Sequence, residues 1–174
     1  RRSGGAQYLA AREKAKENFT RSAEERGWLA NGERKNDAVD KALVSGEDQI
    51  FVPGVGQEAL GFIVKQSPVL QRLLEAGRLE KLLVTCGITK YFYSDVLLDE
   101  GGFGDRFILV VDGKAMEHFE DGSHELYDRG AVVGELSFVN QDVPREYSLV
   151  CAHKDVRVIV VTRSAVEVAC EGIH

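Results

Sequence analysis

Two short segments carry the residues best suited to binding an anion. Residues 133–138 read VGELSF, and residues 144–148 read PREYS. Gly134 lets the backbone approach a ligand closely at the start of a short helical turn, whose free N–H groups favour negative charge. Arg145 offers a forked guanidinium to phosphate oxygens, and Glu135 can accept a hydrogen bond from a ribose hydroxyl. The segments predict a pocket for a sugar phosphate, with a structural Glu135–Arg145 ion pair as the alternative.

A second glycine-rich segment does not predict a nucleotide site. Residues 50–59 read IFVPGVGQEA and match the G-x-G-x-x-A pattern of dinucleotide-binding folds. That fold needs a second parallel strand ending in an acidic residue about 20 residues further on, but residues 70–83 have a helical pattern. Pro53 would also break the first strand. We therefore interpret this segment as a loop between helices.

The composition is that of a globular domain. The chain has 174 residues, of which 44% are hydrophobic, and a formal net charge of −6. Nearly all of the acid excess lies in residues 49–174, so no basic surface is expected for nucleic acid or for direct membrane insertion. No apolar run approaches the roughly 20 residues of a membrane span. Because the chain begins with Arg1, we expect it to be part of a longer protein.

The cysteines and histidines show no metal-ligand spacing. The three cysteines, Cys86, Cys151 and Cys170, are far apart. In a chain of this size we expect them to be reduced, which fits a cytoplasmic location. Cys151 lies in an apolar run and is expected in the core. We expect no metal ion and no cofactor.

The first part of the chain is predicted to be helical. Helical patterns cover residues 6–29, 37–44 and 57–65. Ser67 followed by Pro68 predicts the start of a further helix that contains Leu70, Leu73 and Leu74. We expect residues 1–66 to form a helical extension or linker and residues 67–174 to form the ligand-binding domain.

The second part is predicted to be an antiparallel sandwich or roll. Short apolar or alternating runs follow one another between residues 88 and 161, with turn residues between them. Asp112-Gly113 and Asp121-Gly122 predict tight hairpins, and residues 153–155 are expected to separate the last two strands. Residues 162–169 predict the first turns of a helix after the roll.

Residues 67–168 resemble the cyclic nucleotide-binding domain family, which occurs in protein kinase A regulatory subunits, cyclic-nucleotide-gated channels and catabolite activators. Residues 97–107 (LLDEGGFGDRF) resemble the glycine- and acid-rich segment between the early strands of the family. Residues 110–115 (VVDGKA) resemble its hairpin, and residues 134–137 with Pro144-Arg145 match its phosphate-binding cassette. Several motifs in the right order are more specific than any one of them.

The resemblance implies an α+β fold, an eight-stranded antiparallel β-roll of jelly-roll type with a helical bundle before it and a short helix after it. It implies a regulatory module that is not an enzyme, with cAMP or cGMP as ligand. Arg145 would hold the cyclic phosphate and Glu135 the ribose 2′-hydroxyl. The ligand-binding residues predicted in this way are Gly134, Glu135, Leu136, Ser137, Arg145, Glu146 and Tyr147.

The sequence departs from the family pattern after Arg145. Val133 replaces a common Phe, while Glu146 and Tyr147 replace residues that are usually small. A carboxylate about 4 Å from a phosphate charge costs on the order of several kcal/mol at an effective dielectric constant near 20. In one interpretation the pocket binds a cyclic nucleotide weakly, or a less charged nucleoside. In the other, Glu146 pairs with Arg145, and the degenerate domain is a structural or protein-interaction module.

The resemblance also implies an output partner. Ligand would bias the arrangement of flanking helices and so act on an attached effector. Arg1-Arg2-Ser3-Gly4 is similar to the basic inhibitory segment of kinase regulatory subunits, which suggests a kinase catalytic subunit. The long helical lead-in would equally suit the cytosolic part of a membrane channel or ion exchanger. The domain itself is expected to be cytoplasmic.

Overall fold

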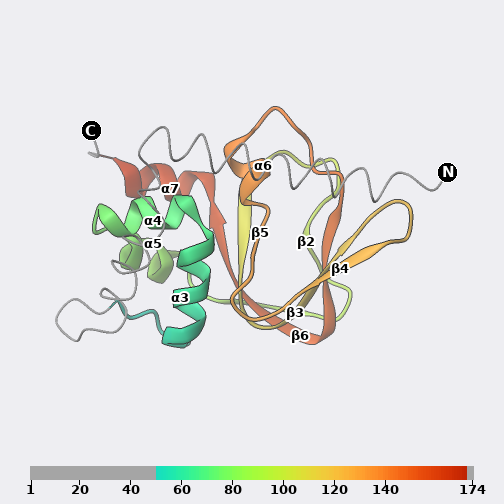
Figure 1. Cartoon of the computed structure of the whole chain (residues 1–174), viewed down its shortest axis with the longest axis horizontal. Coiled ribbons are helices and arrows are strands. Elements are labelled where there is room, and N and C mark those ends of the chain that lie inside the picture. The colour runs from blue at the N-terminus through green and yellow to red at the C-terminus, as the bar shows by residue number, and fades with distance from the viewer. Residues whose placement is uncertain (1–49, 172–174) are drawn as a thin grey trace.

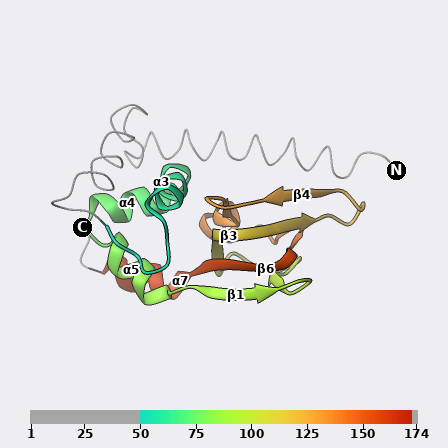
Figure 2. The ribbon, with the colours of Figure 1, turned by 90° about the horizontal axis from the view of Figure 1, so that it is seen from below.

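A computed structural model describes residues 50–171 of the chain. The helices expected over residues 6–29 and 37–44 lie outside the described residues, as does most of the expected 1–66 extension. Within the described part, most of the helices gather at one end of a β-roll, as two perpendicular views show (Figure 1, Figure 2).

In residues 50–171, three helices precede the sheet: α3 (Gln57–Gln66), α4 (Pro68–Glu75) and α5 (Leu79–Cys86). The predicted start of α4 is confirmed. The Ser67 hydroxyl accepts a hydrogen bond from the Leu70 amide at 3.1 Å. Pro68 occupies the first position, where its missing N–H has no helical partner to lose.

The six strands of the described residues form one antiparallel sheet. They are β1 (Thr89–Phe92), β2 (Val96–Leu98), β3 (Arg106–His118), β4 (His124–Tyr127), β5 (Val132–Val133) and β6 (Ser148–Thr162). The long strands β3 and β6 pair with each other from Arg106 opposite Thr162 to His118 opposite Ser148. β6 also pairs with β1 and β2, and β3 with β4 and β5. The predicted antiparallel fold class is confirmed.

The described residues contain six strands, where the resemblance implies eight. Two of the turns predicted from sequence lie inside strands. Asp112-Gly113 is a point within β3 at which the register shifts, with Gly113 at φ 86°. Residues 153–155 continue β6, where Asp155 pairs with Phe92. β3 and β6 therefore stay paired on both sides of the predicted turns. Local hairpins at these two positions would interrupt that long-range pairing. The hairpin at Asp121-Gly122 is confirmed, with Gly122 at φ 84° between β3 and β4.

Alternation along β3 places its side chains in two cores. Phe107 packs in a core shared with the helices, which also contains Leu60, Ile63, Leu70, Leu83 and Ile159. Ile108, the next residue, packs inside the roll with Leu98, Leu149, Cys151 and Val158. Cys151 is therefore a core residue, as predicted. Because Leu60 and Ile63 belong to α3, residues on both sides of Ser67 share one core.

A helix follows the roll, as predicted. α7 (Arg163–Cys170) begins after Thr162, whose hydroxyl accepts a hydrogen bond from the Ala165 amide at 3.3 Å. α7 packs beside α5 at the helical end of the molecule (Figure 1). None of the helices in residues 50–171 is long and apolar enough to cross a membrane.

Candidate functional site

The phosphate-binding cassette predicted from sequence begins with a left-handed glycine. Gly134 has φ 90° and immediately precedes the short helix α6 (Glu135–Val139). A Cβ built on Gly134 would lie 2.9 Å from Cδ1 of Leu98. Glycine is required here both by the backbone angle and by the close approach of α6 to β2.

α6 packs directly onto the loop that follows β2. A Cβ built on Gly104 would lie 1.7 Å from the Ser137 carbonyl oxygen, so only glycine fits between the two backbones. Arg163 joins the same two segments, because its Nη2 donates to the carbonyl oxygens of Gly104 and Phe138. Its guanidinium also lies 4.4 Å from the centroid of the Phe138 ring.

The loop after β2 also fixes the backbone of Arg145. The Arg145 amide donates to the Gly102 carbonyl at 2.9 Å, and the Gly101 amide donates to the Arg145 carbonyl at 2.8 Å. The Arg145 residue is only 4% exposed. Its Nη2 donates to the Arg106 carbonyl at 2.7 Å and lies 3.7 Å from Oδ1 of Asp105. Its Nε is buried and has no hydrogen-bond partner among the described residues.

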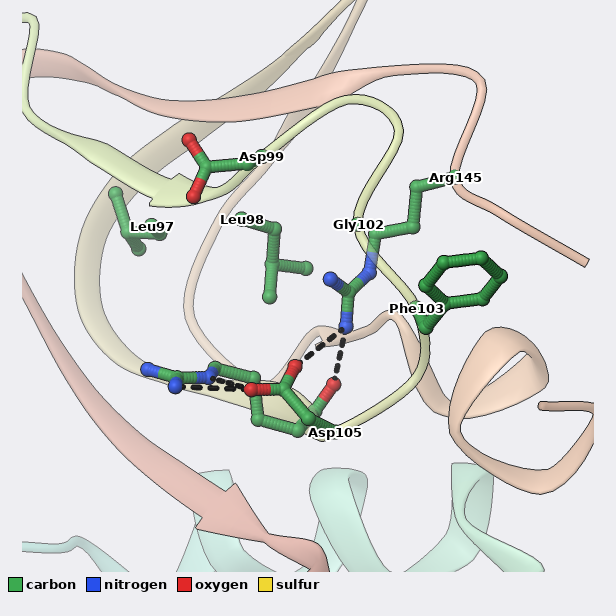
Figure 3. Close-up of a pocket in the computed structure, with 8 residues that line it drawn as sticks. Leu97, Leu98, Asp99, Gly102, Phe103, Asp105 and Arg145 are labelled. Atoms are coloured by element: carbon green, nitrogen blue, oxygen red, sulfur yellow. Dashed lines mark hydrogen bonds and ion pairs between the residues drawn. The ribbon is translucent and has the colours of Figure 1, made fainter.

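Arg145 lies at the wall of a cavity of about 300 Å³, which is the lower end of the range for small-molecule pockets. Figure 3 shows its guanidinium between the ring of Phe103 and the carboxylate of Asp105. Phe103 is 62% exposed at this site, which makes it an aromatic face available to a ligand. The residues that line the cavity are Leu97, Leu98, Asp99, Gly102, Phe103, Asp105, Arg106 and Arg145.

Asp105 connects two guanidinium groups at the cavity. It accepts from Nε of Arg106 at 3.0 Å and lies 2.9 Å from its Nη2, with Arg145 on its other oxygen. Burial alone would raise the pKa of Asp105, but the hydrogen bond and charge of Arg106, with the charge of Arg145, hold it below its usual value. Sequence reasoning missed this residue, although it lies in the family-like segment 97–107.

Glu135 has partners on α4. Its Oε1 accepts from the Ser67 hydroxyl at 2.6 Å and from the Val69 amide at 3.1 Å. Burial raises its pKa from the ordinary 4.5 to about 7, and the hydrogen bonds from Ser67 and Val69 oppose this shift. The alternative of a Glu135–Arg145 ion pair does not occur in the structure, since each of these residues has other partners.

Neither of the two residues after Arg145 lines the cavity. Glu146 is exposed, and the ion pair of Arg145 in the described part of the chain is with Asp105. Tyr147 is buried in the roll, with its ring centroid 6.2 Å from that of Phe119. Leu136 and Ser137 are half-buried on α6. Of the seven ligand-binding residues predicted from sequence, Arg145 alone lines the cavity. A Cβ added to Gly134 would meet Leu98, which is one of the lining residues.

No cluster that could hold a metal ion occurs in residues 50–171, because no three His, Cys, Asp or Glu side chains converge there. The site therefore offers a guanidinium, an aromatic face and a carboxylate in a partly apolar cavity. This combination suits a small organic anion.

Comparison with solved structures finds proteins with a similar path of the backbone. It is similar to the N-terminal domain of a transcriptional regulator from Streptomyces coelicolor, with 21% identity and a TM-score of 0.49 over 59% of this chain and 75% of that one. A second similar structure comes from work on a cyclic-GMP-dependent signalling pathway in bacterial phytopathogenesis. Its sequence identity is 19% and its TM-score 0.46, over 53% of this chain and 76% of that one. The regulatory domain of Toxoplasma gondii PKA, crystallised with cAMP, has 15% sequence identity and a TM-score of 0.47, over 79% of this chain and 46% of that one.

No family model and no curated protein sequence matches the chain. The matched structures include regulatory domains of PKA with cAMP, one of the proteins in which the predicted family occurs. At these identities and TM-scores the likeness concerns the path of the backbone. The ligands named with those proteins are properties of those proteins.

Proposed function

We propose that the chain contains a regulatory sensor domain, without enzymatic activity, that binds a cyclic nucleotide in the cavity beside Arg145. The observation that supports this proposal is the burial of the Arg145 guanidinium together with its unpaired Nε. It is almost fully buried at the wall of a 300 Å³ cavity, and its Nε has no acceptor among the described residues. A buried donor without an acceptor is unfavourable, and a phosphate oxygen would satisfy it with a charge-assisted hydrogen bond.

Asp105 and the Arg106 carbonyl hold Arg145 in position for this role. They occupy Nη2 and leave Nε for the ligand. The guanidinium groups of Arg106 and Arg145 flank the Asp105 carboxylate, so these three groups together are positive, and the Asp99 carboxylate balances them over the cavity as a whole. Because Asp105 is 59% exposed on its side chain, water screens its repulsion of a bound phosphate.

The remaining groups fit a nucleotide in outline. The exposed ring of Phe103 can stack on a base, and Leu97 and Leu98 supply an apolar wall. Gly134 lies close to Leu98 of the cavity wall, and Glu135, Leu136 and Ser137 follow it on α6. We propose cAMP or cGMP as the ligand.

The site is joined to helices that could transmit binding. α6 contacts α4 through Glu135 and α7 through Phe138 and Arg163. Movement of α6 on ligand binding would therefore act on both helices, and through them on an attached kinase, channel or exchanger. A coupling of this kind needs only different ligand affinities in two helix arrangements.

Titration calorimetry with cAMP, cGMP and the corresponding nucleosides tests the proposal. We expect binding by the wild-type chain and a loss of at least tenfold for Arg145→Lys, because a lysine cannot reproduce the fork or the Nε donor. Glu146→Ala is the matched control, since it changes the neighbouring exposed side chain, and should alter affinity less than twofold. Urea unfolding of Arg145→Lys verifies that it folds.

The absence of binding by both wild type and Glu146→Ala would contradict the sensor proposal and favour the degenerate, protein-interaction domain. Binding by Glu146→Ala alone would show that Glu146 closes the pocket. Equal affinities of the wild type and Arg145→Lys would show that the Arg145 guanidinium does not bind the ligand.

A further inference from the structure

Asp99 is a charged residue of the cavity to which the proposed phosphate contact gives no role. It directly follows β2 and lines the cavity with Asp105, Arg106 and Arg145. Both guanidinium groups pair with Asp105. The exposed Asp99 carboxylate, in contrast, forms no hydrogen bond and no ion pair with another residue of the described range 50–171.

The Asp99 carboxylate and the Arg145 guanidinium lie at different places along the cavity. In the view of Figure 3, the Leu98 side chain lies between them, and the Asp105 carboxylate lies beside the guanidinium. Backbone hydrogen bonds hold both residues to Gly102. Its amide donates to the Asp99 carbonyl at 3.2 Å, and its carbonyl accepts from the Arg145 amide at 2.9 Å. The loop after β2 therefore fixes both groups relative to each other.

The free carboxylate constrains what the cavity can bind. An ionised carboxylate only accepts hydrogen bonds, so a ligand that offered nothing but an anion would be repelled by Asp99 and would strip water from it without compensation. A ligand with its phosphate at Arg145 and N–H donors elsewhere would instead gain a charge-assisted contact. Two parallel donors would use both oxygens of the carboxylate, which is the stronger arrangement.

The two purine bases differ in this respect. Guanine carries the N1–H and N2–H donors next to each other, with the acceptor O6 beside them, whereas adenine carries its N6 amine beside the acceptor N1. Adenine would therefore place a lone pair against one Asp99 oxygen. Arg106 adds a donor to the same cavity, because its Nε and Nη2 bond to Asp105 and leave Nη1. A donor there suits O6 of guanine and opposes the amine of adenine.

We propose that Asp99 is a specificity-determining residue that accepts hydrogen bonds from N1–H and N2–H of a guanine base, so that the cavity prefers cGMP to cAMP. This inference rests on the proposed nucleotide site. A two-bond contact between a side chain and a base edge typically discriminates between bases by roughly tenfold to a hundredfold.

Titration calorimetry with three cyclic nucleotides on the wild-type chain is the first test. Cyclic inosine monophosphate (cIMP) keeps N1–H and O6 of guanine and lacks the N2 amine. We expect cGMP to bind at least tenfold more tightly than cAMP, with cIMP between them. Equal affinities for cGMP and cAMP would overturn guanine recognition while leaving the nucleotide site intact. Equal affinities for cGMP and cIMP would overturn the two-bond contact.

The second test is the ratio of the cGMP and cAMP affinities in Asp99→Asn. The amide has the same shape as the carboxylate and can donate to N1 of adenine while accepting from its amine, so the ratio should fall at least fivefold. Glu100→Gln is the matched control, because it removes the same charge from the next residue, which is exposed and does not line the cavity. It should leave the ratio unchanged within twofold.

Loss of one negative charge acts on both nucleotides alike, so the ratio isolates the contact with the base. An unchanged ratio in Asp99→Asn, or an equal fall in Glu100→Gln, would overturn the role of Asp99. If no nucleotide binds to the wild type or to either variant, the proposed function fails, and the guanine preference fails with it.

Discussion

Gly104 is the position at which a single methyl group should damage the candidate site most severely. A Cβ there would lie 1.7 Å from the Ser137 carbonyl oxygen and 2.6 Å from the Phe138 Cα. Both neighbours are backbone atoms, so no side-chain rotation can relieve the overlap. The loop and α6 would have to separate by roughly 1.5 to 2 Å to restore ordinary contact distances.

That separation would also break the hydrogen bonds that hold the two segments together. Nη2 of Arg163 donates to the carbonyls of both Gly104 and Phe138 and could not reach both after the shift. Overpacking typically costs about 1–3 kcal/mol, and a hydrogen bond to a charged group contributes about 1.5–3 kcal/mol. We therefore expect Gly104→Ala to lower the free energy of unfolding by about 3–5 kcal/mol.

Urea unfolding followed by circular dichroism measures this change. With a typical slope of about 2 kcal/mol per molar urea, the midpoint should fall by about 2 M. Gly56→Ala is the control, because a Cβ there meets nothing within 4 Å and the backbone φ is −66°. It should cost less than about 1 kcal/mol.

The same variant tests the site. Gly104 precedes Asp105, whose carboxylate helps to orient Arg145. We expect Gly104→Ala to weaken cyclic nucleotide binding by at least tenfold at temperatures where it remains folded. If Gly104→Ala unfolds within 1 kcal/mol of the wild type, the packing of α6 on this loop is not as described, and the reasoning fails.

Two further predictions concern the groups that surround α6. Between pH 4.5 and about 7 the unfolded chain ionises Glu135 while the folded chain keeps its proton, so stability should fall by about 3 kcal/mol as pH rises through that window. Thermal or urea unfolding across pH should show this loss for the wild type and not for Glu135→Gln; a flat difference between the two would contradict the buried state of the carboxyl. Arg163→Lys keeps the charge but loses the fork that reaches Gly104 and Phe138, and should destabilise the chain by about 1–3 kcal/mol. A free energy of unfolding of Arg163→Lys within 0.5 kcal/mol of the wild-type value would show that the lysine amine replaces both guanidinium hydrogen bonds.

Local sequence signals predicted the elements whose causes are local. Ser67-Pro68 starts α4 because a hydroxyl and a missing amide act within one helical turn. Asp121-Gly122 forms a hairpin because its strands are adjacent in the chain and nothing competes for them. Gly134 and the helix after it were also predicted, since a glycine with positive φ is a local requirement.

The strand count was not predictable in the same way. Asp112-Gly113 has the sequence of a tight turn, but β3 pairs with β6 on both sides of it. Pairing between residues about 40 positions apart outweighed the local preference, so the glycine became a bend in a long strand.

The candidate site divides along the same line. The sequence alone determined which residues could bind a sugar phosphate, because Gly134, Glu135 and Arg145 have the necessary chemistry at a fixed spacing. Only the tertiary structure decided their partners. It pairs Asp105 with Arg145 and leaves Glu146 exposed. It also places the Glu135 carboxylate at the start of α4, where it accepts a hydrogen bond from a residue 66 positions earlier in the chain. Side-chain partners depend on which backbones pack together, and the spacing of residues in a sequence does not contain that information.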